Sequence, residues 1–444
     1  MHERYTISRL IEERGLSSFH YLLLILCSSI YALTGMNVML ISATLPAIVA
    51  EWKVEPVTIG IFLSAGYLGM FIGAITCGVV ADVIGRKKTL ILTILLMSFF
   101  TALCSVAWDA TSMSILRFLA GIGLGGSLPQ PGVYLTEFVP SRHRGRFIGL
   151  VETSWVYGAL LSIAFPYLLI PVLGWRLTFL VALVPLILIP AVGLFMPESL
   201  RYLELKGRLN ESLKILRKLG ITGVEASKIS RDRVERYSLI DALRNLWSQT
   251  YRRRTALLWI GWAVLVYTYH GIFIWLPTIY AKEFGLGVMK SLFWTLIVTA
   301  IQIPGYYSAT FLLDPAGRKP VLSVYLAVAG VGSLLLGLSM NINWVLLCSG
   351  IISFFNLGAW AALYTYTPEL YPTSIRGTGS GFAASIGRAA GILAPIATGY
   401  VYATWGLAQT FNVFALAHIL AVVATVALGI ETKGKVLEEI SKSL

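Results

Sequence analysis

Charged residues are scarce in this chain. Only 13% of its 444 residues are Asp, Glu, Lys or Arg, and 57% are hydrophobic, whereas about a quarter of an ordinary soluble domain is charged. A soluble fold of this composition would lack a polar surface, so the composition excludes a soluble globular protein. About twelve apolar stretches approach the ~20 residues that cross a bilayer. The sequence therefore predicts an all-α membrane protein with twelve transmembrane helices.

Cysteine is also rare. The four cysteines all fall in apolar stretches, without a metal-ligand or disulfide spacing (Cys27, Cys77, Cys104 and Cys348). We therefore expect buried thiols, no metal site and no cofactor. No nucleophile–base set occurs in a plausible site, which argues against an enzyme. The first 20 residues are polar and of mixed charge, so we expect no cleavable signal peptide.

Acidic residues are outnumbered, with 22 Asp and Glu against 35 Lys and Arg. A basic surplus can indicate a nucleic-acid partner, but here its distribution argues for topology. Twenty-nine of the 35 basic residues lie in the two tails and in one alternating set of loops, and four lie in the other set. This positive-inside bias predicts cytoplasmic termini in the plasma membrane and no nucleic-acid partner.

One pattern of eight residues occurs twice, 232 positions apart. The residues of the first copy are Asp82, Gly85, Arg86, Lys87, Glu137, Pro140, Arg144 and Gly145, and those of the second are Asp314, Gly317, Arg318, Lys319, Glu369, Pro372, Arg376 and Gly377. A constant offset predicts two pseudo-symmetric six-helix bundles. We expect these bundles at 1–197 and 255–430, a linker at 198–254 and a tail at 431–444. Within the linker, 203–219 is predicted to form one amphipathic helix on the inner membrane surface, or a simple connection.

Ionisable side chains inside the predicted spans are few, and such residues are costly and usually functional. Arg388, near the middle of its span, can clamp a carboxylate through two hydrogen bonds or pair with an internal acid such as Glu152. His270 can carry a proton or serve as a neutral hydrogen-bonding group. Asn37 lies at a similar depth, and Arg117 begins an Arg-x-x-x-Gly-x-x-x-Gly run. We expect a substrate site near the membrane midplane among these groups.

The loop Gly78-x-x-x-Asp82-x-x-Gly85-Arg86-Lys87-Lys88 and its second copy resemble the signature of the major facilitator superfamily. The resemblance covers essentially the whole chain and implies transport by alternating access. In the sugar-porter and related branches, the Glu-x6-Arg pattern and an acid after span six resemble an inner gate; the same residues can instead anchor helix ends. The gate residues implied here are Asp82, Arg86, Glu137, Arg144, Glu198, Asp314, Arg318, Glu369, Arg376 and Glu431.

Two further segments narrow the branch. Residues 269–278 resemble span seven of the metabolite:proton symporters and nicotinate transporters related to synaptic vesicle glycoproteins. Residues 366–377 and 387–395 are similar to spans ten and eleven of that group and of the organic ion transporters, whose anion-carrying members have an arginine at the position of Arg388. Proton-coupled relatives pair the arginine matching Arg117 with an aspartate where this chain has Asn37. Proton coupling, if present, then falls to Glu152 or His270.

These observations predict a secondary active transporter of small organic anions, namely aromatic or heterocyclic carboxylates. We expect a monomer whose partners are a small-molecule substrate, the lipid bilayer and protons. The predicted substrate-binding residues are Arg388, Asn37, His270, Tyr269, Trp275 and Arg117, and the proton-coupling candidates are Glu152 and His270. The alternative is a sugar or polyol symporter or uniporter. A third hypothesis is a non-transporting sensor on the same fold, although no signalling domain is evident.

Overall fold

The computed structural model describes residues 7–12, 15–219, 221, 239–339, 341–371 and 375–433. This part of the chain is helical and contains no strand. The repeat position Pro372 and the tail beyond Lys433 lie outside the described residues.

The described helices are long enough in total for twelve membrane crossings. Nine continuous helical segments of the described chain are long and apolar enough to span a bilayer. Two of these segments, His143–Phe195 and Arg376–Leu428, are 53 residues long. A straight helix of that length would measure about 80 Å, against a hydrocarbon core of about 30 Å. Each breaks once, at Gly174 (φ 70°) or Gly406 (φ 78°), and therefore crosses twice. The helices of Ala110–Thr136 form the remaining crossing.

The N half and the C half are built from equivalent sets of helices. The N-half elements are α2 (Ser18–Trp52), α3 (Pro56–Ile84), α4 (Arg86–Leu103), η1 (Cys104–Val106), α5 (Ala110–Ser127), α6 (Pro129–Thr136), α7 (Ser141–Thr178), η2 (Phe179–Ile187) and α8 (Leu188–Phe195). The C-half elements are α12 (Arg252–Lys282), α13 (Gly287–Ala300), α14 (Gln302–Ala316), α15 (Arg318–Gly337), α16 (Ile342–Glu369) and α17 (Arg376–Leu428). Short helices outside the crossings are α1 (Ile7–Glu12), α9 (Leu200–Leu205), α10 (Leu209–Lys218) and α11 (Leu239–Leu246).

The backbone repeats with the sequence. Gly85 and Gly317, 232 positions apart, end α3 and α14 with φ values of 104° and 99°. Gly174 and Gly406, also 232 positions apart, turn the chain inside α7 and α17 with φ values of 70° and 78°. Such positive φ values favour glycine, because a Cβ atom is strained there. The pseudo-symmetric pair of bundles predicted from the sequence is therefore confirmed.

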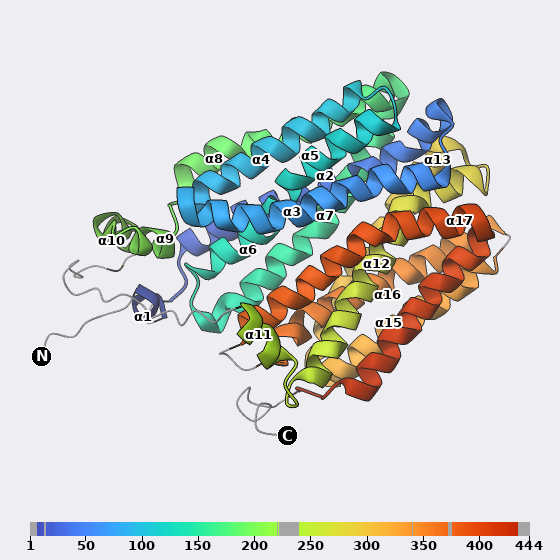
Figure 1. The fold of residues 1–444 in the computed structure, drawn as a ribbon. Helices are drawn as coiled ribbons and strands as arrows, with labels where there is room; N and C mark the ends of the chain where they lie inside the picture. Colours follow the sequence, from blue (N-terminus) through green and yellow to red (C-terminus); the bar gives the residue numbers. More distant parts are fainter. Residues whose placement is uncertain are drawn as a thin grey trace, which may run out of the picture.

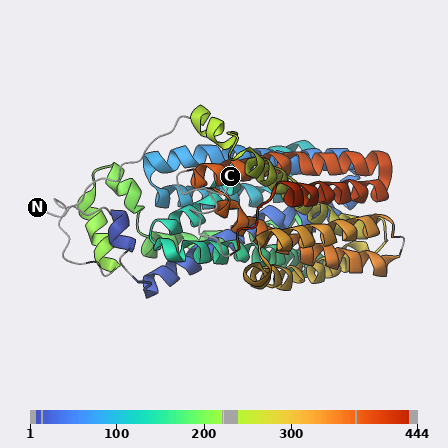
Figure 2. The same ribbon diagram turned by 90° about the horizontal axis from the view of Figure 1, so that it is seen from below.

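The two halves lie side by side with their helices along a common axis (Figures 1 and 2). In Figure 1 the N half is blue to green and the C half yellow to red, and α1, α9, α10 and α11 gather toward one end. We call this end, which also carries Gly85 and Gly317, the linker face. The opposite end, where the chain turns at Gly174 and Gly406, is the loop face.

Several contacts join the halves in the part of the bundle near the loop face. Ser42 of α2 donates to the carbonyl oxygens of Phe273 and Ile274 on α12, at 2.9 Å each. α3 packs against α17 closely enough that a Cβ atom at Gly60 would lie 2.7 Å from the carbonyl oxygen of Pro395. The halves are thus tightly joined on the loop-face side.

The linker differs from its prediction in one respect. The segment 203–219 is not one helix, because Gly207 adopts a φ of 72° between α9 and α10. Leu203 and Leu216 are fully buried, so the apolar face of this segment packs against the protein. The break at Gly207 allows the two short helices to fold onto each other.

Candidate functional site

A cavity of about 260 Å³ lies between the two halves. Its walls are mainly aromatic, contributed by both halves: Tyr31, Tyr67, Trp155, Trp262, Tyr269, Tyr306, Trp360 and Tyr364. Small-molecule sites are typically apolar and aromatic with a few placed polar groups, in volumes from about 300 Å³ upward. This cavity lies just below that range and suits a ligand of about one ring.

Two groups of opposite charge lie in this aromatic wall, Glu152 on α7 and Arg388 on α17. Their repeat mates, Ala384 and Val156, line the same cavity. The pseudo-symmetry thus places both members of each repeat pair at the cavity. In each pair one residue is charged and its mate is small and apolar. The cavity is chemically asymmetric although the scaffold around it is not.

The carboxylate of Glu152 is held by tyrosine. The hydroxyl of Tyr31 on α2 donates a hydrogen bond to Oε2 of Glu152, and Tyr364 of α16 is close enough to interact with the same group. A carboxyl that accepts from a phenol can be present with or without its own proton, since the hydroxyl rotates. The site therefore suits a group that gains and loses a proton.

The guanidinium of Arg388 has no hydrogen-bond or ion-pair partner among the described residues. It lies close enough to Glu152, Tyr31 and Tyr364 for electrostatic interaction. Among the described residues, however, its guanidinium makes no hydrogen bond, and no ion pair within 4.0 Å joins it to an acid. Guanidinium donors that face a cavity without a partner form a binding point for an anion.

His270 also lines the cavity. Its Nδ1 lies 2.9 Å from the carbonyl oxygen of Val266, and a carbonyl can only accept, so the ring proton is on Nδ1. The Nε2 atom of the neutral ring is then an acceptor. The ring packs edge-on against Tyr67, with centroids 4.9 Å apart.

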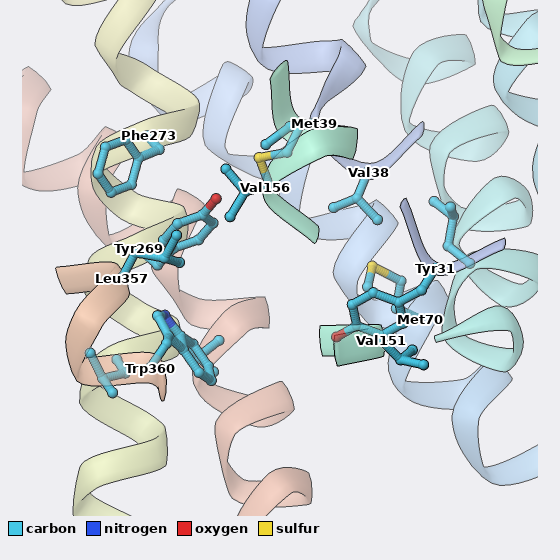
Figure 3. Packing of buried hydrophobic residues seen from close by; sticks show 14 of the residues in the cluster. Tyr31, Val38, Met39, Met70, Val151, Val156, Tyr269, Phe273, Leu357 and Trp360 are labelled. Atoms are coloured by element: carbon cyan, nitrogen blue, oxygen red, sulfur yellow. The ribbon is translucent and has the colours of Figure 1, made fainter. Parts of the chain in front are cut away.

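A hydrogen bond between the halves covers the cavity toward the loop face. The indole Nε1 of Trp155 on α7 donates to the hydroxyl of Tyr269 on α12 at 2.9 Å, and that hydroxyl lies 3.4 Å from Oε1 of Gln302. In Figure 3, Tyr269 and Trp360 of the C half lie across from Tyr31 of the N half. A ligand held between these side chains would contact both halves.

Three predicted substrate residues do not line this cavity. Arg117 is 2% exposed and its guanidinium lies 3.5 Å from the carbonyl oxygens of Asn37 and Val38. The Asn37 side chain points away, donating to the carbonyl of Ala182 at 3.4 Å. Trp275 is buried and packs against Tyr402, with ring centroids 6.1 Å apart. The structure thus brings Arg388, His270, Tyr269 and Glu152 together and leaves the other three outside.

The predicted gate residues form two equivalent clusters at the linker face. In the N half, Arg86 Nε lies 2.9 Å from Glu137, and Glu198 accepts the backbone N–H groups of Arg86 and Lys87 at 2.9 and 3.1 Å. Ser199 also donates to Glu137.

In the C half, Arg318 Nε lies 3.1 Å from Glu369, and Glu431 accepts the N–H groups of Arg318 and Lys319 at 3.1 Å each. Thr432 donates to Glu369 at 2.6 Å. Each cluster joins helix ends of one half, and none of these contacts crosses to the other half. Their role as a gate stays a prediction.

The remaining gate residues lie at the edges of these clusters. Arg144 donates to the carbonyl of Val139 at 2.9 Å and pairs with Glu12 at 3.4 Å. Its mate Arg376 lies 3.4 Å from the carbonyl of Tyr371. Asp314 is paired with Arg318 at 3.1 Å but is 87% exposed, and Asp82 is exposed.

Sequence reasoning missed most of the aromatic wall, and the repeat contains a signal for it. Each of the eight aromatic residues has a non-aromatic mate; for example, Trp155 matches Gly387 and Tyr364 matches Gly132. By contrast, Tyr134 and Tyr366 are mates, and both donate to a backbone carbonyl beside a gate cluster. Duplicated aromatics support the scaffold, whereas unmatched aromatics can line the site.

Comparison with known proteins identifies the family. Residues 32–444 match the family described as sugar (and other) transporter. The chain is 35% identical over 435 residues to the niacin transporter NiaP of Acinetobacter baylyi, covering 97% of this chain and 98% of that one. It is 34% identical to the putative niacin/nicotinamide transporter NiaP of Bacillus subtilis, covering 91% and 94%.

A solved structure gives the same fold. The xylose transporter XylE from E. coli, in an inward open conformation, superposes with a TM-score of 0.75 at 18% identity, covering 95% of this chain and 99% of that one. The chain therefore belongs to the sugar (and other) transporter family and has the major facilitator fold.

Proposed function

We propose that this protein carries a small aromatic or heterocyclic carboxylate across the membrane, with nicotinate as the type of substrate. The observation that carries the proposal is Arg388, whose guanidinium faces an aromatic cavity without an internal partner. A guanidinium binds a carboxylate through two parallel hydrogen bonds. The surrounding tyrosine and tryptophan rings would hold the planar ring of the ligand by stacking.

The relatives support this substrate class. Two proteins more than 30% identical over most of the chain are named for niacin transport, and niacin is a single pyridine ring with one carboxylate. The cavity of about 260 Å³ suits a ligand of that size. A sugar is less well served, because its hydroxyls need several polar partners and the wall contains few.

We infer that the linker face is cytoplasmic and the membrane is the plasma membrane. The basic residues of the linker and tails support this orientation. With the halves joined near the loop face, the cavity is shut off from the outside and the protein is in its inward-facing state. Outward opening would then require the contacts of Ser42 and of Trp155 with α12 to break.

We assign the coupling proton to Glu152. It is the one carboxyl among the residues that line the cavity, and it lies within the influence of Arg388. An anionic ligand on Arg388 would reduce the positive field at Glu152 and so favour its protonation. Uptake of the anion would thereby be linked to uptake of a proton.

Transport by purified protein in liposomes tests the proposal. Arg388→Gln is expected to lower nicotinate uptake on the order of ten- to a hundredfold, because hydrogen bonds to charged groups contribute about 1.5–3 kcal/mol each. Ser385→Ala is the matched control: its hydroxyl donates to the carbonyl of Gly381 on the same helix at 2.9 Å and does not line the cavity. Undiminished uptake by Arg388→Gln, or uptake of xylose or glucose in place of carboxylates, would refute the assignment.

A further inference from the structure

A buried polar network joins three helices of the C half directly behind the cavity. The amide Nδ2 of Asn356 on α16 lies 3.1 Å from Oγ1 of Thr268 on α12 and 3.2 Å from Nε2 of His418 on α17. His418 Nδ1 lies 2.7 Å from the carbonyl oxygen of Phe414. The side chains of Thr268, Asn356 and His418 are completely buried.

For a neutral imidazole, the hydrogen-bond partners assign the protons of this network. A carbonyl can only accept, so His418 carries its proton on Nδ1 and its Nε2 accepts from Asn356. Both N–H groups of Asn356 are then used. Its Oδ1 is buried and has no hydrogen-bond partner among the described residues. A buried acceptor without a partner destabilises the folded state, so stability alone would not favour this arrangement.

The equivalent positions of the N half do not form a polar network. The repeat mates of Thr268, Asn356 and His418 are Met36, Leu124 and Leu186, all apolar. Met36 and Leu124 are themselves fully buried. The same positions of the same fold can therefore be filled by hydrophobic packing. We therefore expect a role of the polar network that is specific to the C half.

The network lies next to residues that line the cavity. Thr268 directly precedes Tyr269 and His270, and Asn356 directly precedes Leu357, with Trp360 one turn further along α16. Beside the network, α17 packs closely against α12: a Cβ atom at Gly271 would lie 2.6 Å from the ring of Phe414. Displacing Asn356 would shift both walls.

We propose that Asn356 is a positioning residue of the carrier: with His418 and Thr268 it sets α12 against α16 and so determines which single-ring ligands fit between them. The inference rests on the proposed function, since it concerns the selectivity of the same cavity. Asn356 does not touch the ligand. It acts through Tyr269 and His270 on one wall and through Leu357 and Trp360 on the other.

The test replaces the three polar residues of the C half with the apolar residues that occupy the equivalent positions in the N half. In the triple variant Thr268→Met, Asn356→Leu, His418→Leu, we expect an unchanged or higher melting temperature. The half-saturation concentration for nicotinate should rise about tenfold, the effect of roughly 1.4 kcal/mol, with little change in maximal rate. Discrimination between nicotinate and benzoate should fall. His418→Gln, which keeps an acceptor for Asn356, should resemble the parent.

A purely structural role would give a different result, namely a lower melting temperature and less active protein with an unchanged half-saturation concentration. That result, or unchanged selectivity in the triple variant, would overturn the inference. A second readout does not depend on the substrate. In Val266→Cys protein the alkylation rate of the introduced cavity thiol should change several-fold when the triple substitution is added, and the four native cysteines are buried.

The two proposals fail in different ways. If the parent protein transports neither nicotinate nor benzoate, the proposed substrate class is wrong, and the alkylation rates alone decide the role of Asn356. If the parent transports nicotinate but both the half-saturation concentration and the alkylation rate are insensitive to the triple substitution, the substrate class stands and the positioning role is wrong.

Discussion

Glu152 is the acid of the cavity, and its contact with Tyr31 suggests how its role can be isolated. Glu152→Gln keeps an oxygen that accepts from Tyr31 but cannot carry a proton. We expect this variant to exchange nicotinate across the membrane at equal pH on both sides and to lose accumulation driven by a pH gradient. Radiolabelled counterflow and gradient-driven uptake measure the two activities separately.

Tyr31→Phe serves as the control for Glu152, because it keeps the acid and removes only the hydroxyl donor. We expect it to retain accumulation driven by a pH gradient. If Glu152→Gln accumulates nicotinate as well as the parent does, the proton must bind elsewhere, and His270 becomes the candidate because its Nε2 is an acceptor at the cavity.

Individual residues were predicted unevenly. Arg388, Glu152 and His270 could be found because ionisable groups in an apolar span are rare. Arg117 is equally rare in type, yet it packs against main-chain carbonyls away from the cavity. Sequence depth gives the distance along a helix but not the side of the helix on which a residue lies. That side depends on packing between helices, which one sequence does not reveal.

At the level of elements, the two glycines that end α3 and α14 are expected to be important for stability. A Cβ atom at Gly85 would lie 2.3 Å from Oε2 of Glu198, and one at Gly317 would lie 2.6 Å from Oε2 of Glu431. Both glycines also have φ near 100°. We expect Gly85→Ala or Gly317→Ala to destabilise the protein by about 1–3 kcal/mol from backbone strain alone.

Thermal unfolding of the purified protein in detergent measures this effect. Gly78→Ala is the control, because Gly78 lies inside α3 with no neighbouring atom within 4 Å, and alanine favours a helix by up to about 1 kcal/mol. If all three variants melt together, neither the positive φ of Gly85 and Gly317 nor the nearby Glu198 and Glu431 carboxylates restrict these positions to glycine.

The helices themselves were the most predictable elements. The lengths of the apolar stretches predicted the helices, and the constant offset of 232 positions predicted their grouping into two halves. The linker was less predictable, since the amphipathic period continued through Gly207 while the backbone broke there. Periodicity reports which side of a segment is apolar, but a left-handed turn at a single glycine leaves almost no trace in that pattern.

For the whole molecule, the orientation in the membrane is open to a direct experiment. Glu55 is exposed at the loop face and Lys206 is exposed at the linker face. In intact cells we expect a membrane-impermeant thiol reagent to label Glu55→Cys and not Lys206→Cys, with Lys206→Cys labelled only after permeabilisation. The unmodified chain is the background control, because its four cysteines are buried. The opposite labelling would invert the topology.

The hydrogen bond from Trp155 to Tyr269 has a consequence for the resting state of the carrier. A neutral hydrogen bond contributes about 1 kcal/mol net, which shifts an equilibrium between two conformations only about fivefold. This bond alone would therefore leave the other state often sampled, and the Ser42 contacts and the packing of α3 against α17 add to the preference for the state closed at the loop face. A ligand that engages the Tyr269 hydroxyl would replace the lost bond, so that the cargo itself lowers the barrier to its release or capture on the far side.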